Sequence, residues 1–283
     1  MIGAIPRRNP PSPGLLGQRN PLGVVGGMGS LATAKFLEVL ARKSRVERDQ
    51  DHIPFICLSL PNIPDRSHAI SIGSDAPLRQ ILERAYWLEK AGCGALAIPC
   101  NTAHLWATEI KQALSVKLID MVEITRQAME GSRRSEARNL RSISLGTRAS
   151  MENGLYTEPN EKEFGKKFLR SLRKLQDDTV RIIADVKSGN ITEAQDNLMR
   201  LVQAARSFEP DKIILACSEL SAICGDLADD NDIVDPINIL ADACIDWWRA
   251  ESQPREEQQA YPFAAFETAL PIEISVGRIH AGA

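Results

Sequence analysis

The chain has 283 residues, of which 43% are hydrophobic and 25% are charged, and its formal net charge is −3. This length suits about two domains with a core each, and the composition is that of an ordinary globular protein. The weak net charge argues against a nucleic-acid partner, and no apolar run reaches the roughly 18 to 20 residues that cross a bilayer, so we expect no membrane partner either. A short group of arginines interleaved with Ser, Glu and Asn is typical of a solvated surface linker: Arg133, Arg134, Arg138 and Arg141.

The first twenty residues are rich in proline and lack an apolar segment, which predicts a disordered tail and not a secretory signal. The chain has six cysteines but no Cys-x-x-Cys pair. This pattern favours free thiols in a reducing cytoplasm over a disulfide framework. Residues 251–283 receive no predicted element and are treated as a C-terminal extension.

Short apolar runs alternate with helical periodicity from Pro21 onward. The pattern predicts strands at 22–25, 55–60, 95–98 and 118–121. It predicts a turn at 26–29 and helices at 32–42, 78–91, 102–114 and 124–129. Gly92 suits the position that closes the second of these helices.

The second half repeats this rhythm. It predicts strands at 142–145 and 213–216, with a turn over 146–154. Helices are predicted at 164–187 (with a break near 174–178), at 192–208 with Thr192 as the N-cap, and at 237–249. Strands that alternate with helices indicate an α/β fold with mostly parallel sheets. Because both halves follow the same pattern, we predict a duplicated α/β unit.

Each half places a cysteine directly after a predicted strand, in Pro99-Cys100-Asn101-Thr102 and in Ala216-Cys217-Ser218-Glu219. Ligands of open α/β sheets bind beyond the carboxyl ends of the strands, so the two thiols can face one ligand from opposite sides. Stereoinversion needs this geometry, because one thiolate removes a proton from carbon while a thiol delivers one to the other face. A thiol pKa of about 8.5 is close enough to neutrality for both roles, and the turns that follow the strands offer N–H groups that stabilise a thiolate.

A buried cysteine that acts only as a small hydrophobe is the alternative for each thiol. That interpretation suffices for Cys57, Cys93, Cys224 and Cys244, which lie in apolar or unremarkable surroundings.

Three other features leave alternatives open. The turn Gly27-x-Gly29-x-x-Ala32 matches a loose dinucleotide pattern, although the second strand lacks the acidic residue that the pattern needs. Arg66 follows a strand in a proline-rich loop, where it either clamps a carboxylate or pairs with Asp65. His104, one helical turn after Cys100, either tunes that thiol or is a structural histidine, and the histidines show no metal-ligand spacing.

The order and spacing of seven short motifs resemble the aspartate/glutamate racemase family, and within it the aspartate racemases, over about residues 22–243. The motifs are Gly26-Gly27-Met28-Gly29, Asp49-Gln50-Asp51-His52, Pro61-Asn62-Ile63-Pro64-Asp65-Arg66, Pro99-Cys100-Asn101-Thr102-Ala103-His104, Val186-Lys187-Ser188-Gly189-Asn190, Ala216-Cys217-Ser218-Glu219-Leu220 and Asp235-Pro236.

The resemblance implies two similar Rossmann-like α/β domains with the active site in the cleft between them. The first would comprise residues 21–118 plus 235–250 and the second residues 119–234. It also implies a homodimer that needs neither pyridoxal phosphate nor a metal.

By the same resemblance, Cys217 takes the α-proton from the L isomer of a dicarboxylic amino acid and Cys100 takes it from the D isomer. Arg66 and Lys187 would hold the side-chain carboxylate, and groups near Asn101 and Ser218 the α-carboxylate. The positions that match substrate contacts are Met28, Asn62, Arg66, Asn101, Thr102, Ser150, Lys187, Ser218 and Glu219.

The chain departs from the family pattern at Gly146–Ser150, where Arg148 stands in the turn that the family presents to its substrate. A longer diacid, or a substrate with another anionic group, is therefore an alternative to aspartate. Related maleate isomerases, hydantoin racemases and arylmalonate decarboxylases use these cysteines differently. A diacid-binding module without turnover is the remaining alternative.

Overall fold

The computed structural model describes residues 20–131, 141–156 and 161–251. The predicted tail at 1–20, most of the arginine-containing linker and the C-terminal extension lie almost wholly outside these residues. Within the described part, no helix is both long enough and apolar enough to cross a membrane.

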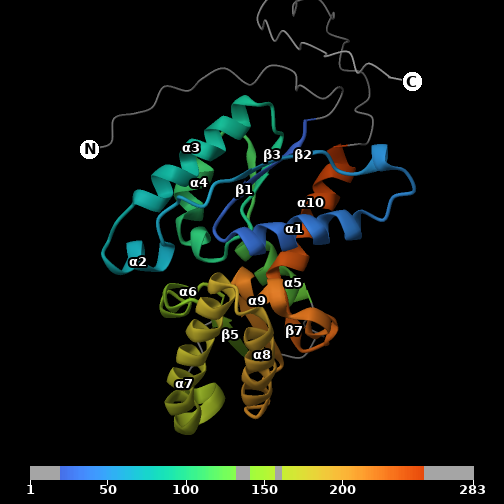
Figure 1. Cartoon of the computed structure of the whole chain (residues 1–283). Coiled ribbons are helices and arrows are strands. Elements are labelled where there is room, and N and C mark those ends of the chain that lie inside the picture. Colours follow the sequence, from blue (N-terminus) through green and yellow to red (C-terminus); the bar gives the residue numbers. More distant parts are fainter. Residues whose placement is uncertain (1–19, 132–140, 157–160, 252–283) are drawn as a thin grey trace, which may run out of the picture. The chain divides into compact units, whose positions relative to one another are not determined.

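The chain forms two parallel sheets connected by helices (Figure 1). The first half contains β1 (Leu22–Gly26), α1 (Ser30–Ser44), η1 (Asp49–Asp51), β2 (Phe55–Ser59), α2 (Arg66–Ser71), α3 (Ala76–Lys90), β3 (Ala95–Ala97), η2 (Thr102–Trp106), α4 (Ala107–Ala113), β4 (Lys117–Ile119) and α5 (Met121–Gly131). The second half contains β5 (Ser142–Gly146), α6 (Arg148–Glu152), α7 (Glu161–Ser188), α8 (Ile191–Arg206), β6 (Lys212–Ala216), α9 (Ser218–Ile223), η3 (Gly225–Asp229), β7 (Ile233–Val234) and α10 (Pro236–Glu251).

All strand pairs in both sheets are parallel. The first sheet has the order β2-β1-β3-β4 and the second the order β5-β6-β7. In a parallel sheet all carboxyl ends lie at one edge, so the residues that follow β1, β2 and β3 meet there, as do those that follow β5 and β6. The predicted fold class, α/β with parallel sheets, is confirmed.

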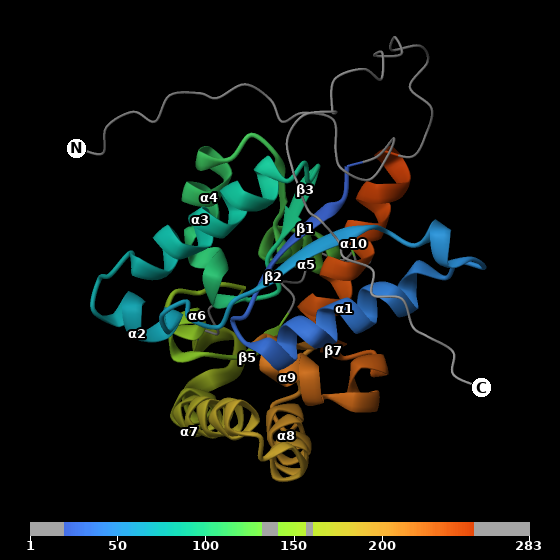
Figure 2. The ribbon, with the colours of Figure 1, turned by 45° about the horizontal axis from the view of Figure 1, so that its top comes forward.

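The first sheet is covered on both faces, which is why its strands are almost continuously apolar. One face packs with α1 and α10 into a core that includes Leu22, Phe36 and Leu240. The other face packs with α3 and α4 around Ile81 and Leu96. Figure 2 shows α1 and α10 side by side, apart from α3 and α4.

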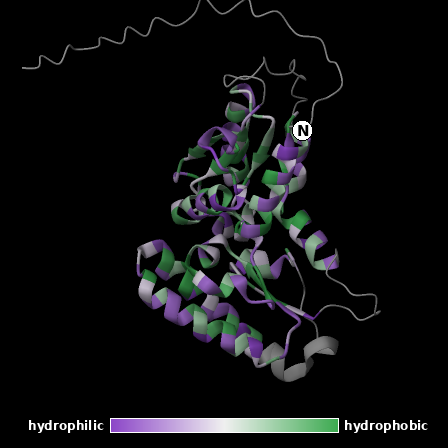
Figure 3. Cartoon of the chain, turned by 90° about the vertical axis from the view of Figure 1, so that its right-hand side faces the viewer, coloured by the Kyte–Doolittle hydropathy of each residue, from purple (hydrophilic) through white to green (hydrophobic). Residues whose placement is uncertain are grey.

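The second sheet is packed in the same manner. Helices α7 and α8 cover one face through a core that includes Ile143, Leu198 and Leu215. The opposite face packs against α5, where Val122 and Ile214 share a smaller cluster. Figure 3 shows hydrophobic residues concentrated on the strands, while the helices carry hydrophilic residues on their outer faces.

The glycine turn after β1 has a specific steric cause. Gly27 has a φ of 86°, and a Cβ atom there would lie 2.6 Å from the backbone of Leu60. Only glycine meets both conditions. The turn therefore lies directly against the chain that leaves β2, at the carboxyl edge of the sheet.

Four predicted elements differ from the structure. Helix α7 has no break near residues 174–178, because Leu175, Thr179 and Ile182 continue its buried face and no proline or glycine lies within 174–178. The predicted turn at 146–154 contains α6, which Thr147 caps by accepting a hydrogen bond from the Ser150 N–H.

Asn190, and not Thr192, is the N-cap of α8. Met121 begins α5 and does not end a strand.

Two segments contain more helix than the sequence predicts. The loop after β2 forms α2, with Asp65 capping it through the His68 N–H. The segment after Cys217 forms α9 at once. Both helices are short, with 6 residues each, and lack a periodic apolar pattern that a sequence pattern can detect.

Candidate active site

Both strand-end cysteines lie at the carboxyl edges of their sheets. Cys100 follows β3 after Ile98 and Pro99, and η2 begins two residues later. Cys217 follows β6 directly, and α9 begins at the next residue. Each residue is 4% exposed, yet both line the same cavity. The two halves of the chain therefore bring their thiols to one site.

The cavity contains nine residues that the sequence singled out: Met28, Arg66, Cys100, Asn101, Thr102, Lys187, Cys217, Ser218 and Glu219. Its volume is about 270 Å³, counting the part that opens to solvent. Without the open solvent the enclosed volume is only about 20 Å³, far below the ~300–1,000 Å³ of typical ligand pockets, so the side chains around the two thiols lie close together. Two other hollows, one beside Trp248 and one between α7 and α8, are lined by no cysteine.

Two predicted contact residues lie outside this lining. Asn62 is exposed, and its Oδ1 atom accepts a hydrogen bond of 2.7 Å from the Arg84 guanidinium. Ser150 is buried behind the cavity wall, where its hydroxyl contacts Thr102 and Thr147. Asn62 thus joins the loop after β2 to Arg84 of α3. Ser150 supports Thr102 and Thr147, which line the cavity.

Arg148 points away from the cavity. Its side chain is 55% exposed and forms an ion pair of 3.2 Å with Asp177 on α7. The expectation that Arg148 faces a substrate is therefore wrong. Because α6 begins at Arg148, the backbone turns there and Thr147 is the residue that lines the cavity.

The sequence missed three lining residues, Asp65, Ser67 and Thr147. Thr147 follows β5 as Cys217 follows β6, so its position at a strand end was the signal that could have identified it. Asp65 and Ser67 flank Arg66 in the loop that becomes α2, and nothing in their spacing separates them from ordinary capping residues.

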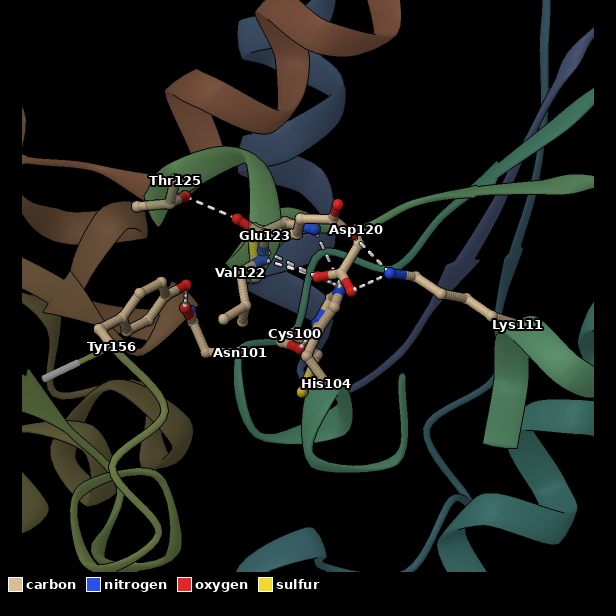
Figure 4. A network of polar contacts seen from close by, with 10 residues as sticks. Cys100, Asn101, His104, Lys111, Asp120, Val122, Glu123, Thr125 and Tyr156 are labelled. Carbon is tan, nitrogen blue, oxygen red and sulfur yellow. Dashed lines mark hydrogen bonds and ion pairs between the residues drawn. The ribbon is translucent and has the colours of Figure 1, made fainter. Parts of the chain in front are cut away.

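Cys100 is held through its backbone by a buried histidine (Figure 4). His104 Nε2 accepts a hydrogen bond from the Met121 N–H at 3.2 Å, which leaves Nδ1 to donate to the Cys100 carbonyl at 2.9 Å. Burial lowers the pKa of His104, with the nearby Asp120 carboxylate opposing the shift. The ring is therefore neutral, and its role is to position Cys100, not to exchange protons with the thiol.

A guanidinium lies beside the Cys100 sulfur. Arg66 is 9% exposed and donates hydrogen bonds to the carbonyls of Met28 at 3.0 Å and Pro64 at 3.2 Å. Arg66 does not form the ion pair with Asp65 that was one alternative. The Asp65 carboxylate pairs instead with Lys187, with 3.6 Å between Oδ2 and Nζ. The burial of Cys100 raises the pKa of its thiol, and the Arg66 charge works in the opposite direction.

Cys217 has a carboxyl group beside it instead. Its Sγ donates a hydrogen bond of 2.9 Å to Oε2 of Glu219, which is 4% exposed. Burial raises the pKa of Cys217 well above its usual value, and the Glu219 charge raises it further. The prediction of lowered thiol pKa values in the cleft is wrong for this ligand-free site, because burial outweighs the adjacent N–H groups.

Several polar contacts bridge the halves at the cavity. The hydroxyls of Thr102 and Thr147 lie 2.9 Å apart. The Tyr156 hydroxyl donates to Asn101 Oδ1, next to Cys100 (Figure 4). These contacts hold the segment after β3 against the segment that follows β5.

Neither a metal nor a dinucleotide fits this site. In the described ranges, no three His, Cys, Asp or Glu side chains gather in a way that could hold a metal ion. The glycine turn does not open onto a free groove, because a Cβ atom on Gly29 would lie 3.2 Å from the Glu219 carboxyl. Glu219 therefore fills the space beside the turn. A dinucleotide would need that space for its pyrophosphate.

The sequence model of the Asp/Glu/Hydantoin racemase family matches residues 25–244. A broad specificity amino-acid racemase of Bacillus subtilis is 26% identical over 235 residues, which are 81% of this chain and 98% of the relative.

Solved structures are similar over the same part of the chain. An aspartate racemase of Picrophilus torridus has a TM-score of 0.67 and 26% identity, covering 83% of this chain and 95% of its own. A glutamate racemase of Thermus thermophilus has a TM-score of 0.53 and 19% identity, covering 84% of each chain. At this lower identity the likeness concerns the fold, with two α/β domains.

Proposed function

The chain belongs to the Asp/Glu/Hydantoin racemase family, and from this premise we propose that it interconverts the L and D isomers of aspartate or glutamate through Cys100 and Cys217. As a member of this family it is a racemase that works without pyridoxal phosphate. The observation that carries the proposal is the meeting of two thiols from duplicated halves in one small cavity. The similarity to racemases of aspartate and of amino acids in general supports it.

The proposed reaction transfers two protons through one carbon. With the L isomer, the Cys217 thiolate takes the α-proton, and the electron pair of the C–H bond is delocalised into the α-carboxylate. The Cys100 thiol then delivers its proton to the opposite face, which gives the D isomer. The reverse reaction exchanges the two roles.

The burial of the thiols suits this reaction. An α-proton is very weakly acidic, so a strong base is needed to remove it. Burial raises the pKa of both thiols, and a thiolate derived from a less acidic thiol is a stronger base. Exclusion of water from the site also strengthens each electrostatic contact that stabilises the carbanion.

The cavity is lined by two cations, Arg66 and Lys187, and by two carboxyl groups, Asp65 and Glu219, which suits a substrate that carries both carboxylate and ammonium groups. Arg66 and Lys187 supply two cations from α2 and α7, and we propose that they hold the side-chain carboxylate. The Asn101 amide, the Thr102 and Thr147 hydroxyls and the groups at Ser218 would hold the α-carboxylate. Related isomerases and decarboxylases remain the alternative, and their use of a single cysteine or a neutral substrate would leave one thiol or one cation unexplained.

A chiral assay of the purified protein without added cofactor tests the proposal, using L and D isomers of aspartate, glutamate and longer diacids. We expect racemisation, together with exchange of the α-proton in D₂O. Cys100→Ser and Cys217→Ser should each lose activity by about a thousandfold or more, because each removes one of two required bases. Cys57→Ser, which changes a thiol outside the cavity, is the control.

Near wild-type rates in either cavity variant would contradict the two-thiol mechanism. Binding of diacids without proton exchange would favour the non-catalytic alternative. We also propose that the protein acts in the cytoplasm as a homodimer; sedimentation of the purified chain tests the second point.

A further inference from the structure

One oxygen of a buried carboxyl group in the cavity is left without a partner. Oε2 of Glu219 accepts the hydrogen bond from Cys217 at 2.9 Å. Oε1 is buried and has no hydrogen-bond partner among the described residues. A buried carboxylate oxygen without a donor is costly, so this arrangement indicates that a donor arrives with the ligand.

A donor without a partner belongs to another residue that lines the cavity. Asn101 Nδ2 is also buried and without a partner in the described part of the chain, while its Oδ1 is held by Tyr156. One free acceptor and one free donor in a single cavity complement the ammonium and the carboxylate of an amino acid. Arg66 and Lys187 cannot serve an ammonium group, because both are cations.

The Glu219 charge also opposes ionisation of the neighbouring thiol. A carboxylate in contact with Sγ stabilises the S–H form and disfavours the thiolate. The other titratable or charged groups that face this cavity are Asp65 and Arg66 at the start of α2, Cys100 after β3 and Lys187 at the end of α7. Of the acidic groups that line it, Glu219 is the one in hydrogen-bond contact with Cys217.

We infer that Glu219 binds the α-ammonium group of the substrate through Oε1, and that this ion pair releases Cys217 for catalysis. The inference rests on the proposed function and assigns the site to α-amino acids as a class, not to diacids in general. Once the ammonium neutralises Glu219, the Cys217 thiol gives its proton to water, and the electron pair of the S–H bond stays on sulfur. Before the substrate binds, the same carboxylate keeps the thiol protonated and unreactive.

Aspartate and succinate form a matched pair of probes, since they differ only in the ammonium group. By titration calorimetry, we expect the wild type to bind aspartate about tenfold or more tightly than succinate. Glu219→Gln should bind the two equally, and the exposed Glu152→Gln should behave as the wild type. A structural role for Glu219 would weaken both probes alike.

The second measurement needs no ligand. The rate of iodoacetamide labelling at Cys217, followed by peptide mass spectrometry, should rise with pH. In Glu219→Gln its midpoint should fall by about one pH unit or more, because the opposing charge is gone. Gly29→Ala separates the two effects, since its methyl group would stand 3.2 Å from Oε1 and crowd that atom, so that the side chain shifts by a few tenths of an ångström while its charge remains. That variant should lose the preference for aspartate and keep the wild-type midpoint.

An unchanged preference for aspartate in Glu219→Gln overturns the inference, and so does an unchanged Cys217 midpoint. A wild type that binds succinate as tightly as aspartate overturns it as well, and one that binds neither probe counts against both this inference and the proposed function. A wild type that prefers aspartate over succinate but does not racemise it would contradict the proposed function and leave this inference standing.

Discussion

The two halves of this chain carry the same fold to the same cavity but surround their sulfurs with opposite charges. Cys100 follows β3, an inner strand of the first sheet. Burial raises the pKa of its thiol, and the nearby Arg66 guanidinium opposes this rise. Cys217 follows a strand of the second sheet and donates to the Glu219 carboxyl, which adds to the effect of burial.

This difference shows that the strand ends place the two thiols at one cavity, while the residues next to each sulfur shift its pKa differently. Burial raises the pKa of both thiols, and the neighbouring Arg66 charge opposes this shift at Cys100 whereas the Glu219 charge adds to it at Cys217. The two directions of a racemisation need opposite protonation states, so the asymmetry predicts that substrate binding, and not the resting state, brings the thiols into balance. Five experiments follow, in decreasing order of effect.

The largest effect is expected at the cation of the first half. Arg66→Met removes the charge beside Cys100 and leaves the Met28 and Pro64 carbonyls without their donor. Loss of a charge-assisted contact with the substrate should lower kcat/KM for diacids by about a hundredfold or more. Arg84→Met, which removes a buried arginine outside the cavity, is the control. Equal losses in the two variants would mean that Arg66 is needed only for folding.

The histidine that positions Cys100 should affect stability. His104→Leu leaves the Cys100 carbonyl and the Met121 N–H unpaired, and we expect the free energy of unfolding in urea to fall by about 2 to 4 kcal/mol. Thr125→Val, which removes one hydroxyl contact to the Met121 carbonyl, should cost less.

The lowered pKa of His104 also predicts how the stability of the folded protein changes with pH. Its pKa is lower in the folded protein than the usual 6.5, so below about pH 6.5 the unfolded chain binds a proton that the folded chain does not. Stability should therefore fall as the pH falls through this range and approach a plateau below the folded pKa. If His104→Leu shows the same decline, another group causes it.

Labelling of the resting enzyme tests the contrast between the sulfurs directly. Both thiols are equally buried at 4% exposure, so the charges beside them should decide the order of reaction. We expect iodoacetamide to modify Cys100 several-fold faster than Cys217, because thiolate is the reactive form. Peptide mapping with time measures both rates in one sample. Faster labelling of Cys217 would reverse the assignment of acidities.

The smallest effect is expected at the arginine of the second half. Arg148 forms an exposed ion pair with Asp177, and such pairs contribute at most about 1 kcal/mol. Arg148→Ala should therefore leave racemisation within about twofold of the wild type. A large change in substrate preference would show that Arg148 reaches the cavity when a ligand is bound.

Much of the fold could be predicted because its signals are local. Periodic apolar residues identified six of the seven described strands and the long helices, but not the two-residue strand β7, and Gly27 marked the turn that only glycine allows. The short helices α2, α6 and α9 were missed, since capping by Asp65 or Thr147 becomes visible only once their partners lie in contact. The continuity of α7 likewise depends on the core that Leu175 and Ile182 join.

The site, like the fold, has features that the sequence predicts and features that depend on tertiary contacts. The residue types and their places after strands singled out Cys100 and Cys217, because strand ends converge in any parallel sheet, whereas the role of Arg66 was decided only by the family resemblance. The order of the residues could not reveal that Asn62 is turned toward Arg84, that Arg148 faces outward, or that Glu219 lies against Cys217. Such facts depend on distances between segments far apart in the chain, and burial and neighbouring charge, which set each thiol's pKa, exist only after those segments have packed together.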